Sequence, residues 1–327
     1  MRIMCNWMKR FVWLNVSLAE VGSIVLRKYA IKLVPFILTV LLLLTGCATK
    51  APQTSGAAEG KLTVYASFYP MADFARQVGG DLVDVVTMVP DGTEPHDWEP
   101  TAADVAGLGK ASVFVYNGAG MEHWAEDVLA SLQSKSLIVV EASRGITLLE
   151  GDAKVRDSHV WLNPANAKAE MENIKQAFAQ ADPEHKDVYE ANFTKAAAEL
   201  EKLDQEFKAA LSPLKNKEII VAHQAFGYLC DAYGLTQVAI EGVAADAEPD
   251  PARVAEIIEL AREHKVKVIF FEELVSPKVA EAIASAIGAK TDVLSPLEGL
   301  SEEQRAAGGN YYSVMRQNLK ALVAALQ

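Results

Sequence analysis

Cysteine and aromatic residues are scarce in this sequence, and each scarcity narrows what the chain can be. It holds three cysteines in 327 residues, and aromatic residues make up only 8%. Cys5 and Cys47 fall in the N-terminal segment described below, which leaves Cys230 alone in the body of the chain. No internal disulfide is then available, so packing must stabilise the fold. Abundant Ala, Val and Leu with few aromatics favour helices packed on sheets over an all-β sandwich.

Positive charge is scarce as well. The chain has 31 Lys and Arg against 43 Asp and Glu. Residues 1–46 hold six of these basic residues and one acidic residue, so the remainder has 25 against 42 and a net charge of −17. A surface of this sign repels nucleic acid, and we expect no nucleic acid among the partners.

The longest apolar run, from Leu33 to Thr45, is short for a membrane helix. It has roughly 12 apolar residues, whereas about 20 are needed to span a bilayer. Basic residues precede it, and it ends in the tetrad Leu44 to Cys47. This order predicts a secretion signal over residues 1–46, with a buried strand as the alternative.

The tetrad before the predicted cleavage point resembles a lipobox, in which the cysteine becomes the lipidated first residue of the mature chain. Several acyl chains on Cys47 would give a stable anchor, since one alone binds weakly. Residues 47–60 then read as a flexible tether from Cys47. We therefore expect an extracytoplasmic protein anchored to the cell membrane.

From Lys61 onward, short apolar runs rich in β-branched residues alternate with helical patterns, which predicts parallel sheets covered on both faces. The predicted strands are 62–66, 83–89, 112–116, 137–141, 218–222, 236–240, 266–271 and 291–294. The predicted helices lie near 70–79, 101–110, 122–133, 165–181, 224–233, 251–264, 277–287 and 310–326. Asp250-Pro251 and Ser276-Pro277 each predict a capped helix start.

The fold class is therefore α/β, with two lobes, 61–181 and 214–327, joined by one long helix at 182–213. Asp182 can cap this helix and Pro183 can open it, and Ser212-Pro213 ends it. Its apolar positions keep a spacing of three to four over about 29 residues, or roughly 43 Å. Such a helix can lie along both lobes and hold their separation nearly constant.

Three of the six histidines share a context. His96 lies in GTEPHDWEP, His159 in DSHVWLNP and His223 in VAHQAFGYL. His96 and His223 follow predicted strands, at the sheet edge where ligands bind in parallel α/β folds, and His159 precedes a helix. One such histidine alone is more often structural, but three in equivalent places indicate a metal site. Packing or surface positions on helices are predicted for His123, His185 and His264.

These motifs, together with VIFFEELVSPKVAEAIA at 268–284 and GNYYSVMRQNL at 309–319, closely resemble the metal-specific solute-binding lipoproteins of zinc and manganese ABC importers. The resemblance runs from about Lys61 to the C-terminus. It implies one metal ion in the cleft between the lobes, with ligands that map onto His96, His159 and His223. It also implies the permease and ATPase subunits of an importer as partners, and we expect a monomer.

The fourth ligand separates subgroups of this family. Manganese carriers resemble a pattern with Glu in place of the third histidine and Asp near the last strand, whereas this sequence keeps His223. SPLEG at 295–299 matches zinc-type relatives in which a glutamate completes the site, so the resemblance assigns Glu298. Asp292, Glu94 and a water are the competing candidates.

Three imidazoles and one carboxylate suit tetrahedral Zn²⁺, whereas Mn²⁺ prefers more oxygen ligands and higher coordination. Zn²⁺ is therefore the expected cargo, with a manganese- or iron-carrying member of the family as the alternative. Many zinc members also have a long His-rich loop between the first two ligand motifs. Residues 148–157 are short and contain no histidine, which predicts a single site.

Other residues near the motifs have two possible roles. Glu272 and Glu273 end a predicted strand, where they either bond to a ligand imidazole or are solvated. Trp98, Trp161 and Phe226 either exclude water from the site or pack in the core.

Two other functions compete with transport. A hydrolytic zinc enzyme needs an open coordination position, but Glu298 would close the shell, and HExxH, GxSxG and a glycine-rich phosphate loop are absent from the sequence. We therefore expect no enzyme activity. An adhesin or structural lipoprotein is the second alternative, and adhesion could coexist with metal capture.

Overall fold

The structure is a computed structural model that describes residues 60–132, 134, 136–150, 156–243, 251–274 and 276–327. The predicted signal, Cys47 and nearly all of the tether lie outside the described residues, as does Asp250. Within the described ranges, no helix has the length and apolar character needed to cross a membrane.

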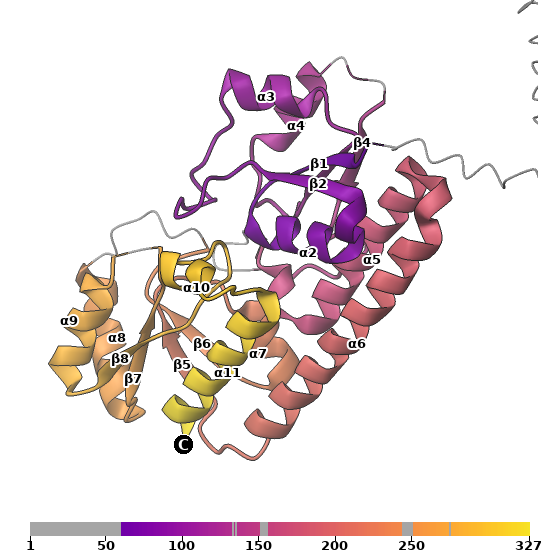
Figure 1. The fold of residues 1–327 in the computed structure, drawn as a ribbon. Helices are drawn as coiled ribbons and strands as arrows, with labels where there is room; N and C mark the ends of the chain where they lie inside the picture. Colours follow the sequence, from indigo (N-terminus) through magenta and orange to yellow (C-terminus); the bar gives the residue numbers. More distant parts are fainter. Residues whose placement is uncertain (1–59, 133, 135, 151–155, 244–250, 275) are drawn as a thin grey trace, which may run out of the picture. The chain divides into compact units, whose positions relative to one another are not determined.

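The first lobe is a four-stranded parallel sheet with helices on both faces, as predicted (Figure 1). Its strands are β1 (Leu62–Ala66), β2 (Val83–Thr87), β3 (Val113–Tyr116) and β4 (Ile138–Glu141), in the order β2-β1-β3-β4. One face is covered by α2 (Tyr69–Gly79) and α5 (Pro164–Ala181), the other by α3 (Ala102–Leu108) and α4 (Ala125–Ser131). Val113, Phe114 and Val115 are fully buried, so β3 is apolar on both faces because both are covered.

The second lobe repeats this arrangement with a second parallel sheet. Its strands are β5 (Glu218–Val221), β6 (Thr236–Ala239), β7 (Val268–Phe271) and β8 (Lys290–Val293), in the order β6-β5-β7-β8. The helices among its described residues are α7 (Gly227–Tyr233), α8 (Pro251–Glu263), α9 (Lys278–Ile287), α10 (Glu302–Ala306) and α11 (Tyr311–Leu326). The buried side chains of α8 and α9 form a separate apolar cluster on one face of this sheet.

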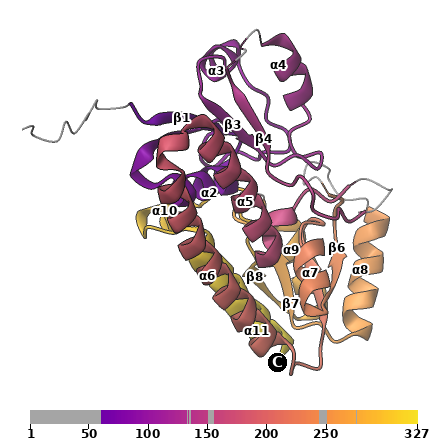
Figure 2. The same ribbon diagram turned by 90° about the vertical axis from the view of Figure 1, so that its right-hand side faces the viewer.

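The linking helix connects the lobes and contacts both of them. A 3₁₀ turn at Pro183–His185 leads into α6 (Lys186–Leu211), which packs on α2 and α5 of the first lobe and on α7 and α11 of the second (Figure 2). The helix ends before Ser212-Pro213 as predicted. Asp182 is the N-cap residue of the 3₁₀ turn and Pro183 opens it, as predicted, whereas α6 itself begins at Lys186. The Asp182 carboxylate accepts hydrogen bonds from the His185 ring and the Tyr189 hydroxyl.

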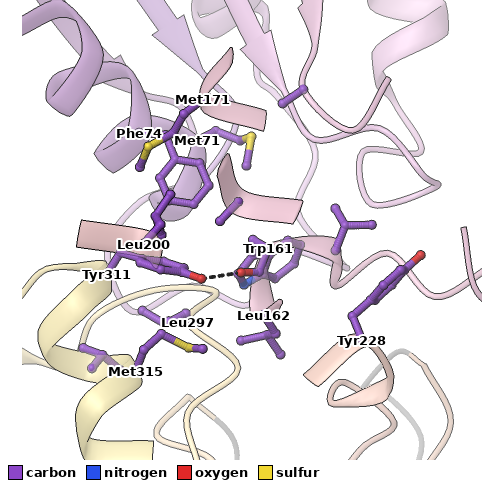
Figure 3. Packing of buried hydrophobic residues seen from close by; sticks show 14 of the residues in the cluster. Met71, Phe74, Trp161, Leu162, Met171, Leu200, Tyr228, Leu297, Tyr311 and Met315 are labelled. Atoms are coloured by element: carbon purple, nitrogen blue, oxygen red, sulfur yellow. Dashed lines mark hydrogen bonds between the residues drawn. The ribbon is translucent and has the colours of Figure 1, made fainter. Parts of the chain in front are cut away.

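One continuous apolar core runs through the junction of the lobes (Figure 3). Trp161 is fully buried and packs edge-on against Phe68, with ring centroids 5.0 Å apart. Phe74 of α2 packs in the same way on Tyr311 of α11, at 5.1 Å. Because helices from both lobes share these contacts, the lobes cannot move far apart without exposing aromatic surface to water.

Several local predictions differ from the structure. The helix α9 begins at Lys278 with Pro277 at its N-cap, and no side chain caps it, so the predicted cap at Ser276 is wrong. His123 lies in the turn before α4 and within 3.5 Å of Glu99. Of the two remaining histidines, His185 pairs with Asp182 and His264 with Glu218.

Candidate metal centre

The structure brings four side chains together where the C-terminal edges of the two sheets meet. His96 lies in the loop between β2 and α3, and His159 directly precedes a 3₁₀ turn at Val160–Leu162. His223 follows β5 by two residues, and Glu298 lies in the segment after β8. One ligand atom from each of the four residues lies within 4.8 Å of the others, so each lobe contributes two donors.

The spacing of the donor atoms matches a small tetrahedral ion. His159 Nε2 lies 3.2 Å from both His96 Nε2 and His223 Nε2, and 2.9 Å from Glu298 Oε1. Glu298 Oε1 lies 3.3 Å from His96 Nε2 and 3.5 Å from His223 Nε2. A tetrahedron with metal–ligand bonds of about 2.0–2.1 Å has edges of roughly 3.3–3.4 Å. These four residues could therefore hold one ion at zinc distances.

Two buried carboxylates orient the imidazoles. His159 Nδ1 lies 2.8 Å from Asp157 Oδ1, and His223 Nδ1 lies 2.7 Å from Glu272 Oε1. An imidazole that donates from Nδ1 to a carboxylate presents the lone pair of its Nε2 to the centre. These lone pairs and the Glu298 oxygen would repel one another in a dry site, since both histidines are 0% exposed. A cation between them removes that repulsion.

The pKa values of the buried groups at the centre are shifted by burial and by their hydrogen-bond partners. Burial disfavours charged imidazole, but the hydrogen bonds that His159 donates to the Asp157 and Glu298 carboxylates raise its pKa above its usual value. Burial likewise opposes charge on His223, while Glu272 and then Glu298 raise its pKa well above the usual value. Burial would raise the pKa of Glu298, but hydrogen bonds from the three imidazoles hold it well below the usual range. Glu298 is thus an anion enclosed by protein.

Of the competing candidates for the fourth ligand, Glu94 lies beside the centre and Asp292 lies on the surface. Glu94 Oε1 accepts a hydrogen bond of 3.1 Å from the His96 N–H, and burial together with the charge of Glu298 raises its pKa to about 8. Asp292 is exposed, and its Oδ1 accepts a bond from the Val293 N–H. Neither carboxylate belongs to the group of four.

Of the two glutamates that follow β7, one lies at the centre. Glu272 is 2% exposed and holds His223, whereas Glu273 Oε1 accepts a hydrogen bond of 2.8 Å from Gln304 Nε2 in α10.

The two tryptophans also differ in position. The Trp161 ring lies 5.3 Å from the His159 ring, whereas half-buried Trp98 packs on Trp124 at 5.5 Å. Phe226 is fully buried in the apolar core.

Asp157 was missed by sequence reasoning as the partner of His159. It is 2% exposed, and its Oδ1 also accepts the His159 backbone N–H at 2.9 Å. The signal was its place two residues before the histidine, in DSH, where a short turn brings the carboxylate to the ring. Gly227 of α7 packs directly on this carboxylate. A Cβ at Gly227 would come closer to Asp157 Oδ2 than van der Waals contact allows.

Two α/β lobes that share one enclosed four-donor site and a long linking helix define a metal-specific solute-binding protein. The family ZnuA, described as zinc-uptake complex component A, periplasmic, matches residues 64–325. The chain belongs to this family, and its predicted fold class is confirmed.

Individual relatives agree with the family. The chain is 42% identical over 296 residues to the high-affinity zinc uptake system protein ZnuA of Bacillus subtilis, covering 86% of this chain and 93% of the relative. It is 39% identical to the zinc-binding lipoprotein AdcA of Streptococcus pneumoniae, and it spans only 56% of that longer protein. The crystal structure of the Zn(II)-bound ZnuA-like domain of the pneumococcal AdcA aligns with a TM-score of 0.74 and 40% identity, covering 82% of this chain and 99% of that domain.

Proposed function

We propose that this protein captures Zn²⁺ outside the cytoplasm and delivers it to the permease and ATPase subunits of an ABC importer. The observation that carries the proposal is the convergence of three imidazole nitrogens and one carboxylate oxygen at zinc distances. Membership of the zinc-uptake family and the names of its relatives support the cargo.

The assigned ligands are His96, His159, His223 and Glu298. Three nitrogens and one oxygen favour Zn²⁺ over Mn²⁺, which prefers oxygen ligands and a larger shell. The four donors also fill a tetrahedral shell, whereas a hydrolytic zinc keeps one position open for water. The closed shell therefore supports binding and transport rather than catalysis.

Delivery requires the shell to open. Because α6 contacts both lobes, a small tilt at the junction is a more economical motion than a wide hinge closure. Docking on the importer would shift Glu298 or His223 in the second lobe and leave His96 and His159 in the first. The ion then loses half of its ligands.

The location of the protein is part of the same proposal. Residues 1–46 would act as a signal and Cys47 as the lipid anchor, with residues 47–60 as a tether to the lobes at 61–181 and 214–327. Names of relatives as lipoproteins support the anchor. The mature protein would act as a monomer with one zinc site.

Metal titration of the full chain, stripped with a chelator, tests the proposal. We expect one tight zinc equivalent and weak manganese binding in the wild type. His223→Ala should weaken zinc binding by more than about 100-fold, because removing a ligand costs more than removing a residue that only hydrogen-bonds to a ligand. His264→Ala, on an exposed ring paired with Glu218, is the matched control and should bind as the wild type does. Equal or tighter manganese binding, or an unaffected His223 variant, would contradict the proposal.

A further inference from the structure

The segment that carries Glu298 has a strained backbone. Residues 295–299 belong to neither a helix nor a strand. Leu297 has a φ of 60°, a left-handed conformation that residues other than glycine rarely adopt, and its side chain is fully buried. Such a conformation persists only where the surrounding structure holds it. The contacts of this segment therefore determine where Glu298 points.

Asn318 of α11 holds the segment through both ends of its side-chain amide. Its Oδ1 accepts a hydrogen bond of 2.9 Å from the Ser295 N–H, and its Nδ2 donates one of 2.7 Å to the Ser295 carbonyl. Asn318 is 2% exposed and Ser295 is 1% exposed. Since both bonds are buried and end on one residue, the segment cannot turn at Ser295 without leaving a polar group unpaired.

The next residue is held from the first lobe. Trp161 Nε1 donates a hydrogen bond of 2.8 Å to the Pro296 carbonyl. The Tyr311 hydroxyl donates in turn to the Trp161 carbonyl at 2.7 Å (Figure 3). Trp161 lies two residues after His159, so these bonds tie the Glu298 segment to the element that carries a donor of the other lobe.

The helix α11 is itself fixed to the linking helix. Arg316, two residues before Asn318, binds Glu206 at 2.7 Å and Glu199 at 2.6 Å, both on α6. These ion pairs therefore fix the position of the Asn318 amide relative to α6, the helix that contacts both lobes. The motif GNYYSVMRQNL thus supplies contacts that lead to the metal centre, although none of its residues belongs to the group of four donors.

We propose that Asn318 is a positioning residue for the Glu298 carboxylate and that it sets the preference for zinc over manganese. The inference rests on the function proposed above. Held in place, Glu298 turns Oε1 toward the three imidazoles, while Oε2 is buried without a hydrogen-bond partner among the described residues. A segment released from Asn318 lets both carboxylate oxygens, or a water, reach the ion. More oxygen donors and a larger shell favour Mn²⁺.

The test compares Asn318→Leu, which is similar in shape but forms no hydrogen bonds, with the wild-type full chain. Zinc affinity should fall by about 10- to 100-fold, as for other groups that orient a metal ligand. Manganese affinity should change by less than about 3-fold, so the ratio of the two affinities falls. Bound Co²⁺ should lose the intense visible absorption of a four-coordinate ion.

A second comparison asks whether Asn318 acts through Glu298. In a Glu298→Ala background, Asn318→Leu should weaken zinc binding by less than about 2-fold, because its effect is already lost. Asn192→Leu is the matched control, since it removes an amide that donates 3.0 Å to the Val78 carbonyl of the first lobe. It should leave both metal affinities and the cobalt spectrum unchanged.

The outcomes separate the two proposals. An equal loss in both backgrounds, or a cooperatively folded Asn318→Leu protein with the wild-type metal ratio and cobalt spectrum, would overturn the role of Asn318. If this variant does not fold, Asn318→Asp provides the same test, because it keeps the acceptor for Ser295 and loses the donor. A wild type without tight zinc binding would refute the proposed function, and the inference with it.

Discussion

Substitution of Gly227 by alanine should weaken zinc binding although this residue touches no metal donor. Gly227 opens α7, and a Cβ there would lie well under 3.0 Å from Asp157 Oδ2. No positive φ requires glycine at this position, so alanine suits the backbone. The clash falls on the end of a side chain, and the Asp157 carboxylate must retreat by about 1 Å to reach ordinary contact.

That displacement is large for a metal site. Asp157 Oδ1 accepts both the ring Nδ1–H and the backbone N–H of His159, at 2.8 and 2.9 Å. A metal constellation has to be held within roughly 0.5 Å of its working geometry. Loss of the partner of a ligating imidazole typically lowers metal affinity by about 10- to 100-fold, or about 1.4–2.8 kcal/mol. We expect Gly227→Ala to fall within this range.

Competition titration with a zinc chelator measures the effect, and thermal unfolding of the zinc-free protein shows whether the fold persists. Gly109→Ala is the control, because its Cβ would meet only ordinary contacts of 3.5 Å or more, far from the site. It should bind zinc as the wild type does. Wild-type zinc affinity in a folded Gly227→Ala protein would refute the claim that Asp157 orients His159.

Three further predictions concern protons. Because the pKa values of His159 and His223 are raised, zinc must displace protons from these imidazoles to bind. Zinc affinity should therefore fall by up to tenfold per pH unit and per imidazole as the pH drops through these pKa values. Titrations at pH 6 and 7.5 measure the fall. The same shifts stabilise the zinc-free protein below the unfolded pKa of about 6.5, and this stability should fade as pH rises through the folded values. Glu170 is fully buried with both oxygens unpaired among the described residues, and burial raises its pKa well above the usual value. The Glu170 carboxyl should therefore lower the free energy of unfolding by about 1.4 kcal/mol per pH unit above its unfolded pKa. Glu170→Gln should remove this contribution, as measured by denaturation of stripped protein at pH 5 and 8. Equal slopes of stability against pH in the wild type and the variant would contradict the prediction.

The sheets were predictable because their pattern is local. The buried strand Val113–Tyr116 has apolar residues on both faces, and only a covered parallel sheet accepts such a run. The linking helix was predictable for a related reason, since its apolar stripe repeats until Ser212-Pro213. The start of α9 was not, because Pro277 fits either the cap or the first helical position, and packing decides between them.

The metal centre was predictable in part. The motifs of the three histidines and the family pattern of the loop with Glu298 led to the four residues that converge. Glu272 and Glu273 were indistinguishable in the sequence, since which of two adjacent carboxylates faces His223 depends on the direction of the chain after β7. The link from Asn318 to Ser295 spans 23 residues, and no spacing rule for helices or strands predicts a contact of that kind.

The division of the four converging donors, two from each lobe, would make a bound ion act as a bivalent ligand of two weak chelators. Each half alone offers two donors, and its affinity would be modest. The affinity of the complete site would come from the high effective concentration at which the lobe spacing presents the second pair of donors to an ion held by the first pair. A small change in that spacing would therefore change the occupancy of the site steeply. The protein could then hold the ion tightly and still transfer it rapidly, with the same four ligands.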